Sequence, residues 1–219
     1  MAWGRGRQPQ ASRPPRALIA PGTRLALAGV ALLCAAVVTA LGVRYAGHTA
    51  AGPLDASVDH WVQARLGLTS VPLTVLTWLG DEAAVTLITI AATLACLLAR
   101  WWRGAALALL AAPVAALSMP SGHTTAVFTL ATLAAVLLIR PGDRVRYLIV
   151  AAAYLLATAV AVAMIAQNFH YFTDVISGAA VGVGTVLTGA LAIDALAPPV
   201  WARARRAAGM HPGTSPGPN

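Results

Sequence analysis

Long apolar blocks, separated by short connectors that contain arginine, are the feature of this sequence that most restricts its fold. Hydrophobic residues make up 58% of the 219 positions and charged residues 10%, a composition far from that of soluble domains. Disordered chains show the opposite balance. The first block, Leu25 to Val43, has 19 residues, enough for a helix to cross a hydrocarbon core of ~30 Å at ~1.5 Å per residue. We therefore predict a membrane protein.

Six such blocks predict an all-α fold, a six-helix transmembrane bundle. They cover residues 25–43, 83–99, 104–117, 124–139, 147–166 and 175–196. The polar stretch 44–81, with Asp55, Asp59, Trp61 and Arg65, is expected to lie on the membrane surface rather than to span it. Residues 1–24 and 199–219 are basic and rich in proline or glycine, so we predict two flexible tails around a membrane domain at 25–198.

The net charge of +8 comes from arginine alone, because the sequence contains no lysine. These arginines lie between apolar blocks and form no basic face, which argues against a nucleic-acid partner. With both termini in the cytoplasm, thirteen of the fifteen arginines fall inside, and Arg44 and Arg65 fall outside. Residues 118–123 and 167–174 then share the extracytoplasmic face. The composition, rich in Ala and Arg and free of Lys, is typical of GC-rich bacterial genomes, so we expect a bacterial plasma-membrane protein.

Two polar groups on that predicted face are candidates for chemistry, because polar residues at membrane depth are costly unless they are paired or hydrated. The first is Pro120-Ser121-Gly122-His123, directly before a predicted helix. Ser121 and Gly122 suit the binding of an oxyanion at a helix start, where free N–H groups attract negative charge. His123 would then stand beside the bound group.

The second group is His170-Tyr-Phe-Thr-Asp174. Its spacing of four predicts that His170 and Asp174 share one helical face, where the carboxylate would fix the tautomer of the ring. An oriented neutral imidazole is a nucleophile, and a second histidine can protonate a leaving group. His170, Asp174 and His123 therefore form a candidate phosphoryl-transfer set. The alternative is a pair of interfacial histidines that only cap helices.

With these motifs the chain resembles the type 2 phosphatidic acid phosphatase (PAP2) superfamily, related to vanadium haloperoxidases, over roughly residues 25–196. The resemblance implies that His170 forms a phosphohistidine, that Asp174 orients it and that His123 protonates the leaving group. Ser121 and Gly122 would hold phosphate oxygens, and no metal or other cofactor is expected. Cys34 and Cys96 lie inside apolar blocks, without the spacing of a metal site.

The sequence also departs from the family pattern. The family's first motif, Lys-x6-Arg-Pro, has no match here, and Met164 occupies the position six residues before the histidine where an arginine is expected. The block 104–117 has 14 residues, about 21 Å of helix, so we expect an unusually short third helix. This shortfall predicts that an internal segment of about 15–25 residues is missing before Pro120. Arg65, Gln167 or Asn168 would have to replace the missing phosphate ligands.

These observations predict an integral membrane phosphatase that acts on a lipid phosphate or lipid pyrophosphate at the extracytoplasmic face. Phosphatidic acid, phosphatidylglycerol phosphate and polyprenyl diphosphate are equally compatible as substrates. Two alternatives stay open. One is a catalytically impaired relative that binds phosphorylated lipid or a partner protein without hydrolysis, and the other is a small transporter or scaffold.

Overall fold

The computed structural model describes residues 17–47, 51–66, 71–78, 80–117, 122–139 and 142–207, and this part of the chain contains helices and no strands. The prediction of an all-α fold is thus confirmed. A short 3-10 helix, η1 (Pro21–Thr23), precedes the α-helices. They are α1 (Arg24–Tyr45), α2 (Pro53–Leu66), α3 (Val71–Trp78), α4 (Glu82–Leu98), α5 (Trp102–Leu117), α6 (Gly122–Leu138), α7 (Arg144–Ala166) and α8 (Phe172–Ala207).

Each of the six predicted apolar blocks forms a helix, but the count of six membrane spans is not confirmed. Among the described residues, three segments are long and apolar enough to cross a bilayer: Pro21–Tyr45, Arg144–Ala166 and Phe172–Ala197. A fourth span results if α3 and α4, bent by 44°, count as one broken helix. Helices α5 and α6 have 16 and 17 residues, or about 24–26 Å, which is less than the ~30 Å core.

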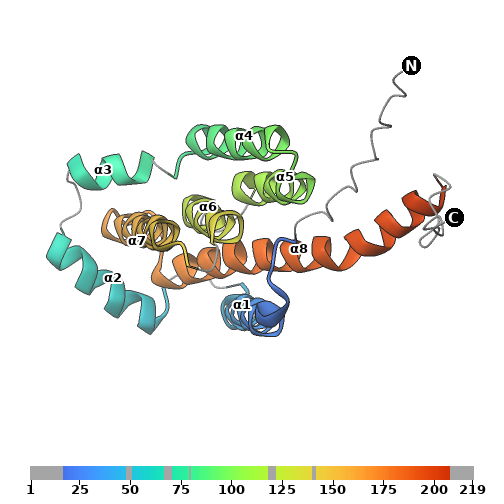
Figure 1. The fold of residues 1–219 in the computed structure, drawn as a ribbon. Helices are drawn as coiled ribbons and strands as arrows, with labels where there is room; N and C mark the ends of the chain where they lie inside the picture. Colours follow the sequence, from blue (N-terminus) through green and yellow to red (C-terminus); the bar gives the residue numbers. More distant parts are fainter. Residues whose placement is uncertain are drawn as a thin grey trace, which may run out of the picture.

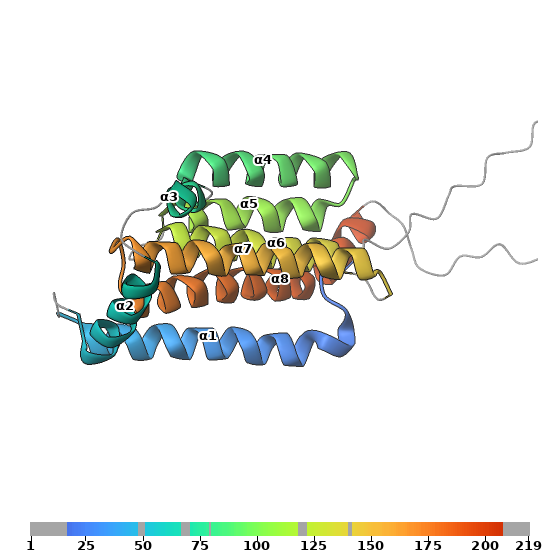
Figure 2. The same ribbon diagram turned by 90° about the vertical axis from the view of Figure 1, so that its left-hand side faces the viewer.

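Six helices run side by side, and α6 lies among α4, α5, α7 and α8, all of which contact it (Figures 1 and 2). The polar stretch predicted to stay at the surface forms α2 and α3, which lie at one end of the bundle (Figure 2). The same end holds the starts of α4, α6 and α8 and the ends of α1, α5 and α7. His123 and the motif at 170–174 therefore belong to one end of the bundle.

Helices α6 and α8 approach each other closely at Gly182. A Cβ atom at this position would lie 2.7 Å from the carbonyl oxygen of Thr125 and 2.9 Å from the backbone nitrogen of Thr129. Small residues permit this kind of contact between membrane helices. Thr125 and Thr129 are both buried. The crossing fixes α6, which carries His123, against α8, which begins just after His170.

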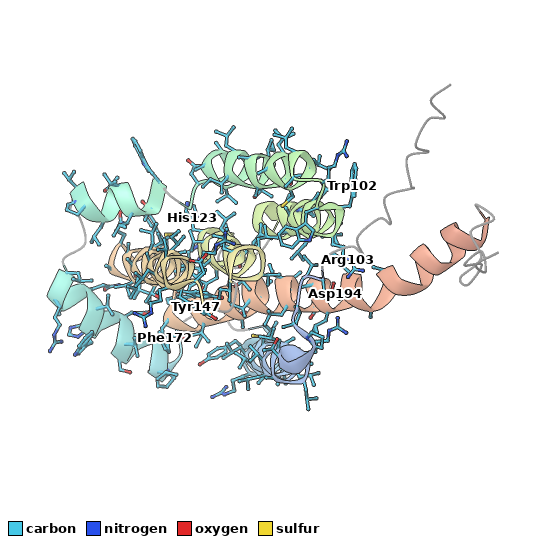
Figure 3. All side chains as sticks on the ribbon, viewed as in Figure 1. Trp102, Arg103, His123, Tyr147, Phe172 and Asp194 are labelled. Atoms are coloured by element: carbon cyan, nitrogen blue, oxygen red, sulfur yellow. The ribbon has the colours of Figure 1, made fainter. Side chains whose placement is uncertain are left out.

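A buried carboxylate holds the opposite end of the bundle together. Asp194 on α8, 3% exposed, accepts hydrogen bonds from the backbone N–H groups of Leu18 and Ile19 and from Nη1 of Arg103 at 2.9 Å. Figure 3 shows Arg103 and Asp194 side by side. Arg24 on α1 lies 3.6 Å from the same carboxylate. These contacts tie α1, α5 and α8 together and include residues placed in the basic tail by the sequence analysis.

Helix α5, the third of the predicted membrane helices, is the shortest of the six formed by the apolar blocks, but only by one residue. Helix α5 begins at Trp102, earlier than the apolar block suggested, and its 16 residues compare with 17 in each of α4 and α6. Residues 118–121, including Pro120 and Ser121, lie outside the described residues. The predicted loss of an internal segment before Pro120 stays a prediction.

Candidate active site

His170 lies in the turn between α7 and α8, and not on a helical face shared with Asp174 as the spacing predicted. Helix α7 ends at Ala166 because Asn168 adopts a left-handed conformation, with a φ of 58°. The N–H groups of Asn168 and Phe169 then bond the carbonyl oxygens of Ile165 and Met164, the pattern of a Schellman C-cap. Helix α8 begins only at Phe172, so His170 precedes it.

Asp174 nevertheless lies next to His170. Its Oδ2 is 3.8 Å from Nδ1 of His170, and the two side chains are both partly buried. The same oxygen accepts the backbone N–H of Tyr171 at 3.4 Å, as acidic side chains do in the first turn of a helix. The carboxylate thus faces the Nδ1 side of the ring and leaves Nε2 for another partner.

His123 enters the same end of the bundle on the first turn of α6 (Figure 3). Its Cβ and Cδ2 atoms would lie 3.1 Å from a Cβ placed on Gly80, so His123 packs against the turn before α4. A Cβ on Gly122 would meet no atom within 4 Å. Ser121, predicted to hold phosphate oxygens, lies outside the described residues.

The charge state of His170 suits a nucleophile. Burial lowers the pKa of His170 below its ordinary value of 6.5, because desolvation disfavours the charged ring. The Asp174 carboxylate raises this pKa, and the charge of His123 lowers it. The net direction keeps the imidazole neutral at pH 7.

Two buried aspartates on α2 bind the start of α8, a feature that the sequence analysis missed. Asp55, 1% exposed, accepts the backbone N–H of Thr173 at 2.9 Å and its hydroxyl at 3.1 Å. Asp59 accepts the backbone N–H of Phe172 at 3.1 Å. Carboxylates at a helix start satisfy free N–H groups and favour the helix dipole. The sequence signal for this feature was the spacing of four residues between Asp55 and Asp59, which places both side chains on one face of a helix.

Gln63, four residues further along α2, binds the other side of the same turn. Its Nε2 donates to the carbonyl oxygen of Ile165 and to Oδ1 of Asn168, each at 3.2 Å. Gln167 donates its own side-chain amide to the carbonyl oxygen of Ala163 at 3.3 Å. The side-chain amide of Gln167, proposed as a substitute for a missing phosphate ligand, thus helps to close α7, whereas Asn168 is engaged through its Oδ1.

The arginine proposed as a substitute also has another contact. The guanidinium carbon of Arg65 lies 4.1 Å from the ring centroid of Trp61, a cation–π contact. Trp61 is exposed, so the pair lies on the surface of α2. Met164, at the position where the family has an arginine, is 3% exposed within an apolar cluster that includes Val62, Leu73 and Val175.

No cluster of three or more His, Cys, Asp or Glu side chains among the described residues has the arrangement of a metal site. The chemistry available to these residues is that of a neutral imidazole beside a carboxylate, with a second imidazole nearby. Such a set can transfer a phosphoryl group through the ring nitrogen.

Comparison with known proteins supports the same interpretation. A family model described as PAP2 superfamily matches residues 105–196, which include His123, His170 and Asp174. The predicted resemblance is thereby confirmed, and a PAP2 domain indicates a function of the phosphatase type. No curated protein and no solved structure matches the chain. The matched region excludes α1 to α4, and therefore excludes Asp55, Asp59 and Gln63.

Proposed function

We propose that this protein is an integral membrane phosphatase that hydrolyses a lipid phosphate or lipid pyrophosphate through a phosphohistidine at His170. The observation that carries this proposal is the environment of His170. Its imidazole is kept neutral by burial, its Nδ1 faces Asp174 at 3.8 Å, and the charge of His123 acts on it. The PAP2 match to residues 105–196 favours phosphoryl transfer over a merely structural use of these side chains.

The proposed reaction has two steps. Nε2 of His170 attacks the phosphorus atom, a P–N bond forms, and the P–O bond to the leaving group breaks. His123 gives its proton to the leaving alcohol or phosphate oxygen, and Asp174 stabilises the positive charge that develops on the ring of His170. A water molecule then attacks the phosphohistidine and gives its proton to His123. Phosphate leaves, and both histidines return to their starting states.

The position of the site favours an amphiphilic substrate. His123 and His170 lie at one end of a bundle whose helices are long and apolar, so a headgroup can reach the site while its chains stay in the bilayer. The arginines at 100–103 and 144–146 belong to the opposite end, and arginine-rich connectors stay in the cytoplasm. We therefore assign the site to the extracytoplasmic face of a bacterial plasma membrane.

One observation favours the second candidate, a relative that binds phosphorylated lipid without hydrolysing it. Met164 fills an apolar cluster where the family has a cation, and Arg65 stacks on Trp61. Cations stabilise the charge of a transferring phosphoryl group, and one lost donor commonly costs about 3–4 kcal/mol of barrier. Loss of all of them would leave a nucleophile with little turnover.

Phosphate release separates the two candidates. Purified protein in lipid nanodiscs is assayed with short-chain phosphatidic acid and with a polyprenyl diphosphate, with and without vanadate, beside the His170→Ala variant. Release that vanadate inhibits and that His170→Ala abolishes supports the phosphatase. Equal release from both proteins contradicts it. Binding of the labelled lipid with no release favours the non-hydrolysing relative.

A further inference from the structure

Helix α2 carries a stripe of three polar side chains, spaced by four residues, that faces the turn between α7 and α8. Asp55 and Asp59 bind the start of α8, and Gln63 binds the end of α7. Residues four apart lie on one face of a helix. The stripe therefore contacts both sides of the short turn, residues 167–171, in which His170 lies.

These contacts provide hydrogen-bond partners for backbone N–H groups that have no partner within α8. The first N–H groups of a helix have no partner within the helix. In α8 the N–H groups of Phe172 and Thr173 donate to the aspartates of α2. The N–H group of Tyr171, the residue before α8, donates to Asp174. Asp55 and Asp59 are 1% and 7% exposed. A hydrogen bond to a buried carboxylate stabilises more than one between neutral groups.

Asp174, which faces His170, is in the first turn of α8, directly after the two residues held by α2. A displacement of that turn would carry Asp174 away from Nδ1 of His170. At 3.8 Å the carboxylate acts on the ring mainly through its charge, so a larger separation would weaken its influence.

We propose that Asp55, Asp59 and Gln63 are positioning residues, through which α2 sets His170 against Asp174 for phosphoryl transfer. This inference rests on the proposed function for its catalytic consequence. The three residues touch the backbone around His170 and not the reacting atoms. They lie outside the part of the chain that matches the PAP2 family model, so the matched domain depends on a helix from the preceding stretch for the geometry of its nucleophile.

The test uses the full chain in nanodiscs with Asp59→Ala, Gln63→Ala and the conservative Asp59→Asn. Two controls match them. His60→Ala alters an exposed residue of the same helix, and Asp143→Ala removes the N-terminal cap of α7, whose carboxylate accepts the N–H of Arg146, at the other end of the bundle. Hydrogen exchange of peptides that cover 167–176, and the rate of carbethoxylation of His170, are measured by mass spectrometry without substrate.

We expect Asp59→Ala to raise amide exchange at 172–173 about tenfold and to raise carbethoxylation of His170 about threefold or more, with Asp59→Asn intermediate. Neither control changes either rate. With a phosphorylated lipid, kcat falls about tenfold or more while KM stays within about threefold, because geometry and not binding is lost. Asp59→Asn retains an acceptor oxygen and serves as the readout if Asp59→Ala does not fold.

Two results would overturn the proposal. One is unchanged exchange and carbethoxylation in folded Asp59→Ala and Gln63→Ala, whether or not the protein hydrolyses lipid. The other is an active wild type whose variants show the exchange effect with unchanged kcat, since the stripe would then serve stability alone. A wild type without phosphatase activity contradicts the proposed function, and the substrate-free measurements still decide whether α2 positions His170.

Discussion

Oδ2 of Asp174 lies 3.8 Å from Nδ1 of His170, although only Asp174 is on helix α8 and His170 precedes it. The carboxylate is therefore held by a helix start while the ring is held by a turn. This arrangement makes the pair sensitive to the position of the first turn of α8 and of the turn at 167–171. The Asp174 carboxylate also raises the pKa of His170, and the direction of this effect can be measured.

The variant Asp174→Asn tests that sign. Burial lowers the pKa of His170 and the Asp174 carboxylate raises it, so removal of the carboxylate charge lowers the pKa further. A nucleophilic imidazole is lost as the pH falls through its pKa. The acid limb of kcat/KM, expected below pH 6.5 in the wild type, should thus move to lower pH in the variant. The maximal rate should fall by no more than about tenfold.

A pH profile of phosphate release measures this shift, and the imidazole resonances of His170 measure it without turnover. His60→Gln, which changes a surface histidine, provides the control. Movement of the acid limb to higher pH in Asp174→Asn would contradict the assigned role of the carboxylate.

Substitution of Gly182 tests the contact that joins the two halves of the site. In Gly182→Ala the new methyl group meets backbone atoms of Thr125 and Thr129, which cannot turn aside as a side chain can. Overpacking of this kind costs about 1–3 kcal/mol, and it pushes α6 away from α8, so that His123 moves relative to His170. We expect lower thermal stability in detergent and lower phosphate release.

The matched control is Gly29→Ala on α1, where an added Cβ meets no atom within 4 Å. This variant should match the wild type or be slightly more stable, since alanine favours a helix. Equal stability and activity in Gly182→Ala would show that α6 and α8 do not approach each other as described.

The carboxylate at the opposite end should matter for stability and little for chemistry. Asp194→Asn leaves the guanidinium of Arg103, whose side chain is 11% exposed, without its charged partner. Removal of one member of a buried ion pair typically costs about 3–5 kcal/mol. Arg24→Gln, at a side chain that is 43% exposed and 3.6 Å away, should cost about 1 kcal/mol or less.

Unfolding in detergent and limited proteolysis measure this difference. Asp194→Asn should expose the backbone near Leu18 and Ile19 to protease, because their N–H groups lose a charged acceptor. An unchanged cleavage rate and unfolding midpoint would contradict the role assigned to this cluster.

A return to the family pattern at position 164 should fail in this chain. Met164 packs with Val62, Leu73 and Val175, so Met164→Arg would bury an unpaired charge, which is strongly unfavourable. We expect a loss of stability and no gain in phosphate release, with Met164→Leu close to the wild type. A folded and more active Met164→Arg would show that this position faces the phosphate.

Much of the architecture could be predicted from the sequence because it depends on local patterns. The apolar blocks predicted the helices, and the alternating directions of these helices place His123 and the motif at 170–174 at one end of the bundle. The shared helical face of His170 and Asp174 was wrong, because it required a helix that includes both residues, whereas α8 begins only at Phe172.

Contacts between residues far apart in the sequence could not be predicted from such local patterns. Asp55 and Thr173 are 118 residues apart, and Asp59 and Phe172 are 113 apart, so only the folded chain shows that α2 binds the start of α8. Similarly, the partners of Asp194 come from the segment before η1, from α1 and from α5. Periodicity identifies the face of a helix that is buried, but not the element that covers it.

The most direct measurement of the central claim is the detection of phosphate on His170. The wild type, incubated with short-chain phosphatidic acid or a polyprenyl diphosphate and quenched rapidly in alkali, is digested and analysed by mass spectrometry, beside His170→Asn and His123→Ala. Phosphohistidine in the peptide that contains residue 170, present in the wild type, formed more slowly in His123→Ala and absent from His170→Asn, is the predicted result. Phosphate release from the wild type with no phosphate on His170 at any quench time would contradict it.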